Sequence, residues 1–144
     1  MNSKMIIGSI EHCDLPELGI SNLEVRVDTG AKTSSLHVDN IQNHVRDGEN
    51  WVTFDIHPNV HNVEEELQCE APVKDIRRIK SSNGSTETRV VLETRFRLGG
   101  QEWPIEITIT DRSDMRYLML FGREGMSDKL LVDPSQTFLV SKDH

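Results

Sequence analysis

An aspartate at the end of an alternating apolar segment is the residue of this chain whose surroundings best suit chemistry. Asp28 follows that segment and is itself followed by Thr29, Gly30 and Ala31. The segment reads as a strand that fixes the backbone, so the Asp28 carboxylate can project into a groove where the strand stops. Gly30 lets the chain turn sharply and lets another backbone approach closely. Thr29 and Ser34 offer hydroxyl groups for the hydrogen bonds of a site. An ordinary turn is the competing interpretation, because Asp, Thr and Gly are common turn residues.

Two further elements could complete such a site. An Asn-Gly pair between two alternating segments is a strong signal for the tip of a β-hairpin, and here it joins residues 75–80 to residues 86–92. The tip residues are Ser82, Asn83 and Gly84. Closer to the C-terminus, an apolar run ends in glycine and is followed by a short helix candidate over residues 123–128. The run ends in Leu120, Phe121, Gly122 and Arg123.

The order of these elements resembles that of the retropepsins, the retroviral-type aspartic proteases. A closer resemblance covers nearly the whole chain. It is to the small bacterial and archaeal proteins known as ATP-dependent zinc proteases, whose fold is retropepsin-like. The matching stretches are residues 15–19, 27–37, 82–84, 120–123 and 131–133.

This resemblance implies an aspartic-type peptidase with Asp28 as its catalytic carboxylate. Two carboxylates that lie close together cannot both ionise, so such a pair holds one proton. The ionised carboxylate takes a proton from water, and the protonated one stabilises the oxyanion that forms when that water attacks a peptide carbonyl. The chain holds a single such motif and is too short for two lobes, so the second Asp28 is expected from a homodimer partner. Thr29 would reach across to the partner's motif, and the hairpin at Asn83 would close over substrate as a flap.

The sequence departs from the retroviral pattern near the site. In retroviral enzymes, the arginine after the second glycine pairs with an acid that follows the Asp-Thr-Gly-Ala string. Lys32 occupies that position here, so Arg123 must pair elsewhere. A long insertion, residues 51–69, also separates the first motif from the flap candidate.

Two other functions stay open. A zinc-dependent peptidase would need three converging protein ligands, and the chain lacks a His-Glu-x-x-His string. The candidate ligands are His57, His61 and Cys69, with His12, Cys13 and His37 scattered elsewhere. Pro58 argues against a helix that presents both His57 and His61. We therefore expect no cofactor, with zinc as the exception, and no ATP site, since a phosphate-binding glycine-rich loop is missing from the sequence. The third possibility is a peptide-binding module that lost its chemistry.

Composition limits the partners. The chain has 144 residues, the size of a single domain (1–144), and a net charge of −8, which disfavours nucleic acid. It has no apolar run long enough for a membrane span. We expect a cytoplasmic protein in which Cys13 and Cys69 are reduced. The basic stretch from Lys74 to Arg97 is either a solvated strand surface or a surface for an acidic ligand. Because relatives of the resembled family are associated with ligases that add glutamates to protein C-termini, an acidic, glutamate-rich peptide is the substrate hypothesis.

Hydrophobic periodicity and regular turn spacing predict an all-β fold, a barrel or a sandwich, with one or two short helices. Of these, the resemblance implies the closed barrel of the retropepsin-like type. The clearest hairpin joins residues 89–98 to residues 103–109 through Gly99 and Gly100, and Pro104 suits an edge or a bulge. Asp47 and Gly48 separate a weaker strand, 41–46, from a better one, 51–56. Residues 58–69 are predicted to be a loop with some helix.

Overall fold

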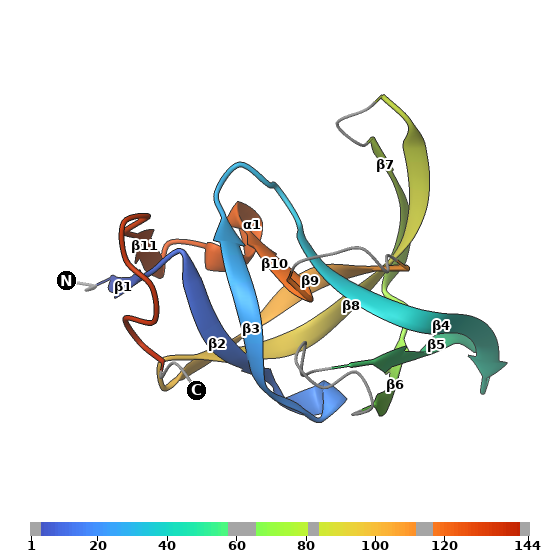
Figure 1. Ribbon diagram of the computed structural model, residues 1–144. Coiled ribbons are helices and arrows are strands. Elements are labelled where there is room, and N and C mark those ends of the chain that lie inside the picture. The colour runs from blue at the N-terminus through green and yellow to red at the C-terminus, as the bar shows by residue number, and fades with distance from the viewer. Residues whose placement is uncertain (1–3, 58–65, 81–83, 112–116, 142–144) are drawn as a thin grey trace.

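Alternating apolar and polar residues produce β-strands along most of the chain (Figure 1). The computed structural model describes residues 4–57, 66–80, 84–111 and 117–141. Two short helical segments accompany the strands: the 3₁₀ turn η1 (Pro16–Leu18) and the helix α1 (Arg123–Met126). The strands are β1 (Met5–Ile7), β2 (Ile10–Leu15), β3 (Ile20–Asp28), β4 (Ser34–Arg46), β5 (Glu49–Ile56), β6 (Leu67–Pro72), β7 (Asp75–Lys80), β8 (Thr86–Leu98), β9 (Gln101–Asp111), β10 (Met119–Gly122) and β11 (Leu130–Val132).

The main sheet has the order β10-β3-β2-β8-β9-β4-β5-β6, and β7 pairs with β8. Strand β10 pairs with β4 as well as with β3, so the pairings from β10 through β8 and β9 return to β10. Among the described residues, however, β2 pairs with β8 at a single position, Asp14 with Arg97. The all-β class is therefore confirmed, whereas the closed barrel stays a prediction.

Glycine-containing turns join the predicted hairpins as expected. Gly99 and Gly100 have φ angles of 58° and 84° between β8 and β9, and Asp47 and Gly48 have φ angles of 52° and 81° between β4 and β5. Positive φ at both central positions is the twist that a two-residue hairpin turn requires. Pro104 lies in a part of β9 that has one described strand neighbour, β8. Strand β4 pairs with residues 107–111 of β9, further along the strand. The amide of Arg95, which pairs with Pro104, donates to the Glu17 carboxylate at 2.8 Å rather than to β9. Residue 104 has no second described strand beside it, so the edge interpretation is confirmed.

Several predicted boundaries were wrong. Strand β6 occupies residues 67–72, so the predicted loop 58–69 does not extend to Cys69. Cys69 and Ala71 of β6 point into the core, and the strand pairs with β5, which supplies the tertiary contact that its sequence alone did not reveal. Residues 58–65, including the helix predicted there, lie outside the described residues. Strand β4 begins at residue 34 rather than 41, and α1 ends at residue 126 rather than 128.

The C-terminal segment is fixed to β2 by a buried glutamate. Glu11 is 0% exposed, and its carboxylate accepts hydrogen bonds from the amides of Gly8 (2.7 Å) and Leu139 (2.8 Å). The Val140 amide (3.3 Å) and the Ser141 hydroxyl (2.6 Å) donate to its other oxygen. Four donors satisfy a charge that would otherwise be costly to bury. Residues 139–141 are thereby held against β2.

Both cysteines are free thiols, as the sequence predicted, and both are buried. Burial, followed by the nearby charge of Asp55, raises the pKa of the Cys69 thiol to about 11. Burial also raises the pKa of the Cys13 thiol far above its ordinary value, with Asp14 as the smaller cause. Among the described residues, no helix is long and apolar enough to cross a membrane.

Candidate active site

Asp28 is the last residue of β3, where a parallel pairing with β10 places it in register with Gly122. Val25 and Val27 anchor the strand in the core, while Asp28 itself is half-buried. The chain turns at once, because the Ala31 amide donates to the Asp28 carbonyl at 3.1 Å. The Gly30 amide donates to Asp28 Oδ1, also at 3.1 Å. The carboxylate is thus oriented by its own loop at the end of a rigid strand.

The loop after Asp28 touches the glycine of the second motif. A Cβ built on Gly122 would lie 2.6 Å from the carbonyl carbon of Thr33 and 3.0 Å from the carbonyl oxygen of Ala31. Only glycine leaves room for this approach. The Gly122 amide donates to the hydroxyl of Ser34, 3.0 Å away, and Ser34 is 1% exposed. The two sequence motifs therefore meet, and the Ser34 hydroxyl joins them.

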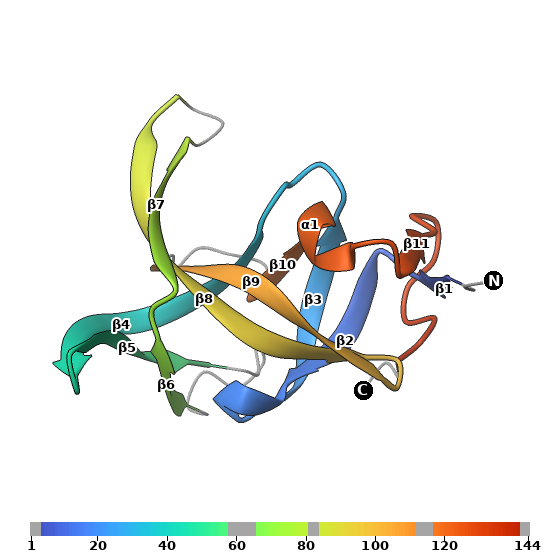
Figure 2. The same cartoon turned by 180° about the vertical axis from the view of Figure 1, so that it is seen from behind.

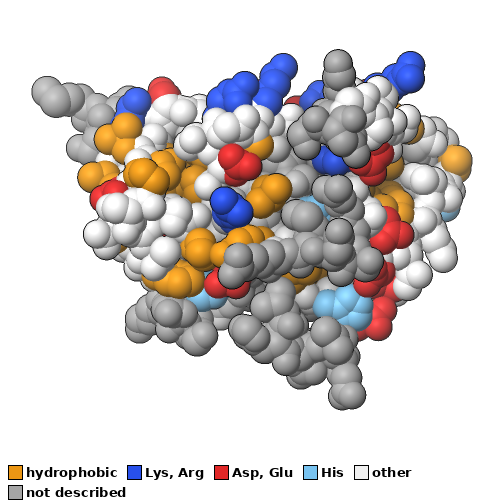
Figure 3. All heavy atoms as spheres, turned by 45° about the horizontal axis from the view of Figure 1, so that its top comes forward, with side chains coloured by type: hydrophobic (Ala, Val, Ile, Leu, Met, Phe, Trp, Pro, Cys, Tyr) orange, Lys and Arg blue, Asp and Glu red, His pale blue; other side chains and the backbone are white. Residues whose placement is uncertain are grey.

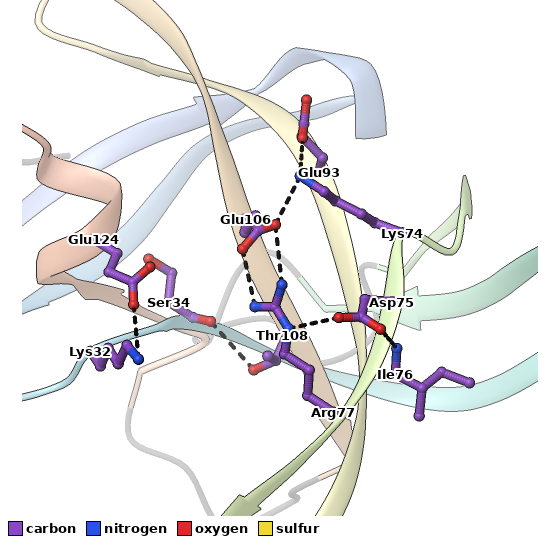
Figure 4. A network of polar contacts seen from close by, with 10 residues as sticks. All are labelled: Lys32, Ser34, Lys74, Asp75, Ile76, Arg77, Glu93, Glu106, Thr108 and Glu124. Atoms are coloured by element: carbon purple, nitrogen blue, oxygen red, sulfur yellow. Dashed lines mark hydrogen bonds and ion pairs between the residues drawn. The ribbon is translucent and has the colours of Figure 1, made fainter.

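Arg123 holds the same loop from the other side. Its amide donates to the Ala31 carbonyl at 2.9 Å, and its Nη1 donates to the Gly30 carbonyl at 3.2 Å. The Lys32 ammonium lies 3.7 Å from the Glu124 carboxylate, in the close-up of Figure 4. Arg123 therefore does pair away from residue 32, as its sequence context required, and its partners are backbone carbonyls. The neighbouring ion pair has the lysine on the loop and the acid on α1.

Aromatic packing supports β10 and α1 beneath the loop. Phe121 is fully buried and stacks on Phe96, with their ring centroids 4.4 Å apart. The Trp103 indole donates to the carbonyl of Gly125 in α1 at 2.8 Å. Leu120 is half-buried and pairs with Ser35 of β4. The sequence did not indicate the Trp103 contact, because it joins elements more than one hairpin apart.

The predicted flap is a hairpin of β7 and β8, which pair from Asp75 with Val91 to Lys80 with Thr86. Gly84 is exposed and has a φ of 88°, whereas Ser82 and Asn83 lie outside the described residues. Figures 1 and 2 show the hairpin rising from the same end of the molecule as the β3–β4 loop. The hairpin and the Asp28 loop therefore lie at one end of the protein.

An ion-pair network lies at the base of this hairpin (Figure 4). Arg77 of β7 reaches over β8 to Glu106 of β9, with 3.1 Å between Nη1 and Oε1. Lys74 contacts both Glu93 (2.5 Å) and Glu106 (2.8 Å), and Arg77 also contacts Asp75 at 2.9 Å. Hydrogen bonds from Lys74 and then Arg77 lower the pKa of the Glu106 carboxyl. The network links three strands on the face of the sheet away from the core.

Most of the basic stretch has acidic partners within the chain. Arg95 and Arg97 both contact Glu102 at 2.9 Å, and Arg89 contacts Glu87 at 3.1 Å. Figure 3 shows Lys and Arg side chains along the upper border of the face that it presents. The paired arginines agree with a solvated strand surface, the simpler interpretation of this stretch.

The described residues do not fit a zinc site. Among them, no three His, Cys, Asp or Glu side chains come together as ligands. His57 Nε2 lies 3.0 Å from an Asp39 oxygen, and the Cys69 thiol is 3.5 Å from the Leu18 carbonyl. His61 lies outside the described residues. His12 stacks on Phe138, and the buried His37 lies in β4, so the scattered candidates do not converge.

Proteins from several bacteria are similar to this chain. Proteins named "Probable alpha-L-glutamate ligase" from Shewanella pealeana and Desulfotalea psychrophila are 48% and 49% identical, over 98% and 92% of this chain. The chain spans only 31% and 29% of their lengths. A crystal structure of a Legionella pneumophila protein of unknown function superposes with a TM-score of 0.79 at 27% identity, over 96% of this chain and 99% of that one.

A family match covers nearly the whole chain. Residues 6–143 match the RimB-like family, which is described as "Retropepsin-like aspartic endopeptidase RimB". The match includes the Asp28 loop, the β7–β8 hairpin and the second motif at Gly122. The resemblance inferred from these motifs is therefore confirmed, and the chain belongs to the RimB-like family of retropepsin-like aspartic endopeptidases.

Proposed function

We propose that this chain is an aspartic peptidase that acts as a homodimer, with Asp28 of each copy in a shared active site. The observation that carries this proposal is the Asp28 carboxylate itself, oriented at the end of β3 by the Gly30 amide. Arg123 and Gly122 fix the loop around it, which gives the preorganised carboxylate that acid–base chemistry requires.

The reaction follows from a shared proton. Each chain contributes one Asp28, and two facing carboxylates retain one proton between them because both cannot ionise. The ionised Asp28 removes a proton from water as that water attacks the substrate carbonyl. The protonated Asp28 donates its hydrogen bond to the developing oxyanion. Thr29, exposed beside Asp28, would contact the Asp28 loop of the partner. Closure of the ring of strands into a barrel would keep the Asp28 loop of each copy rigid.

The substrate that we propose is a glutamate-rich peptide or protein tail in the cytoplasm. Support comes from the relatives, which are named for glutamate ligation and contain a region like this chain. A peptidase that cleaves such tails would remove glutamates, the residues that a glutamate ligase adds. The hairpin, which lies at the same end of the molecule as the Asp28 loop, would then close over the bound tail and exclude water.

Substitution of Asp28 by Asn tests the activity, because it removes the charge with little change in volume. The wild type is expected to cleave glutamate-rich peptides, and Asp28→Asn is expected to lose cleavage while keeping its thermal unfolding midpoint. Asp47→Asn is the matched control, since Asp47 lies in a turn with a φ of 52° that asparagine adopts readily. Cleavage that survives in Asp28→Asn contradicts the proposal.

A peptide-binding module without catalysis is the second candidate function. It is favoured by one observation, that the relatives are named for a ligase rather than a peptidase. This module would bind glutamate-rich tails tightly and leave them intact. A zinc-dependent peptidase would instead lose cleavage with a chelator and keep it in Asp28→Asn. The same peptide assay therefore separates all three functions.

A further inference from the structure

The two faces of the β7–β8 hairpin carry different side chains. Residues that alternate along a strand point to opposite faces. Ile76 pairs with Val90, which packs against the core, so Ile76 and Arg78 lie on the face that continues the core side of the sheet. We call this the inner face of the hairpin. Arg77 lies on the opposite, outer face, within the network of Figure 4.

The inner face holds a cation that differs from its neighbours. Each described cation on the outer face of β7 to β9 has an acidic partner within 4.0 Å. These cations are Lys74, Arg77, Arg89, Arg95 and Arg97. Arg78 is exposed and, among the described residues, contacts no carboxylate. Its guanidinium is therefore available to a ligand, whereas those on the outer face are already neutralised.

An exposed apolar side chain lies next to this guanidinium. Ile76 is 56% exposed, although it sits on the face that is buried further along the sheet. A glutamate side chain combines two methylene groups with a carboxylate. The methylene groups can pack on Ile76 while the carboxylate accepts two parallel hydrogen bonds from Arg78. Aspartate is shorter, and glutamine lacks the charge.

We propose that Arg78, with Ile76, recognises an acidic side chain of the substrate, and that this contact sets specificity for glutamate. This inference rests on the proposed function, because it places the peptide between the hairpin and the Asp28 loop. Both elements rise from the same end of the molecule (Figures 1 and 2). The basic stretch contributes to recognition through Arg78, and its outer-face arginines do not take part.

Direct binding tests the inference without requiring cleavage. The affinity of a hexaglutamate peptide is measured by calorimetry for Asp28→Asn and for Asp28→Asn with Arg78→Gln. Loss of an exposed charge-assisted contact is expected to weaken binding about tenfold. Arg97→Gln in the same background removes an equal charge from the outer face and is expected to change the affinity less than about twofold. Arg78→Lys should recover only part of the affinity, because a lysine cannot make the bidentate contact.

The outcomes separate this inference from the proposed function. Equal affinity for Arg78→Gln and Arg97→Gln overturns the role of Arg78, whether or not the wild type cleaves peptides. A selective loss in Arg78→Gln supports the role even if the wild type cleaves nothing, which would leave a binding module. When cleavage occurs, kcat/KM for glutamate peptides should fall about tenfold in Arg78→Gln, while that for matched glutamine peptides should hardly change.

Discussion

Gly122 and Thr33 are in backbone contact: a Cβ on Gly122 would lie 2.6 Å from the Thr33 carbonyl carbon and 2.7 Å from its oxygen. The contact brings β10 against the loop that begins at Asp28. Gly122 is also in register with Asp28 across the parallel pairing. The position of the carboxylate therefore depends on a residue that is remote in sequence and has no side chain.

Replacement of Gly122 by alanine should displace the Asp28 loop. The added methyl group meets backbone rather than a flexible side chain, so we expect a loss of about 1–3 kcal/mol in unfolding free energy and strongly reduced cleavage. Gly19→Ala is the control, because Gly19 has a φ of 74° and open space around its Cα. The Gly19→Ala control should lower the unfolding free energy by about 1–2 kcal/mol through backbone strain. Its cleavage activity should remain that of the wild type. Full activity in Gly122→Ala would contradict the account.

The buried hydroxyl of Ser34 should matter more than its size suggests. Ser34→Ala leaves the Gly122 amide without its acceptor, and an unsatisfied buried donor costs about 1–3 kcal/mol. Chemical denaturation should show this loss, and the cleavage rate should fall as the loop loosens. Ser135→Ala, which removes an exposed hydroxyl paired with Asp133, should leave both quantities nearly unchanged. Equal effects of the two substitutions would argue against a role for Ser34 in joining the motifs.

The network at the hairpin base should make hairpin stability depend on pH. Lys74 and Arg77 lower the pKa of Glu106 from its ordinary value of 4.5. A lowered pKa means that the contribution of Glu106 is present above pH 4.5 and is lost as the pH falls through the lowered value. Glu106→Gln should therefore speed hydrogen exchange of the β7 amides at neutral pH, and its difference from wild type should shrink in acid.

Glu66→Gln is the matched control for this network, because Glu66 is exposed and makes no described ion pair. The β7 amides of Glu66→Gln should exchange hydrogen at the wild-type rate at every pH. High salt should weaken the wild-type network, since exposed ion pairs are screened. The hydrogen-exchange rates of the wild-type and Glu106→Gln hairpins should then become more similar. A Glu106→Gln protein that exchanges like wild type at neutral pH would show that the network does not hold the hairpin.

Glu11 should determine whether the C-terminal segment stays attached. Glu11→Gln replaces an acceptor of four hydrogen bonds with a group whose NH₂ faces donors. Loss of charged hydrogen bonds at a buried site should cost about 2–4 kcal/mol and make residues 133–141 sensitive to carboxypeptidase. Glu66→Gln again provides the comparison. Resistance of the Glu11→Gln tail to digestion would contradict this role.

The sequence predicts much of this fold because its signals are local. The hairpins at Asp47, at Gly84 and at Gly99 follow from turn residues between alternating segments. The Asp28 loop and the apolar run before Gly122 follow in the same way, and their resemblance to retropepsins placed them in one site. The structure indeed brings these two motifs together.

The remaining features depend on contacts that local patterns do not encode. Strand β6 forms because β5 offers it an edge, although its own sequence reads as a loop. Glu11 is one acid among many in the sequence, and only the fold surrounds it with donors. Likewise, the alternation within β7 separates Arg77 from Arg78, but Glu106, one of the two acidic partners of Arg77, lies on β9. Long-range pairing decides each of these cases.

Subunit mixing tests the shared active site most directly. Wild-type protein at fixed concentration is mixed with a threefold excess of Asp28→Asn protein, and subunits are allowed to exchange. If each site needs Asp28 from both copies, random pairing leaves about a quarter of the original activity. The same excess of Asp47→Asn protein should raise the activity instead. Activity unchanged by the Asp28→Asn protein would mean that one chain suffices, and would contradict the shared-proton account.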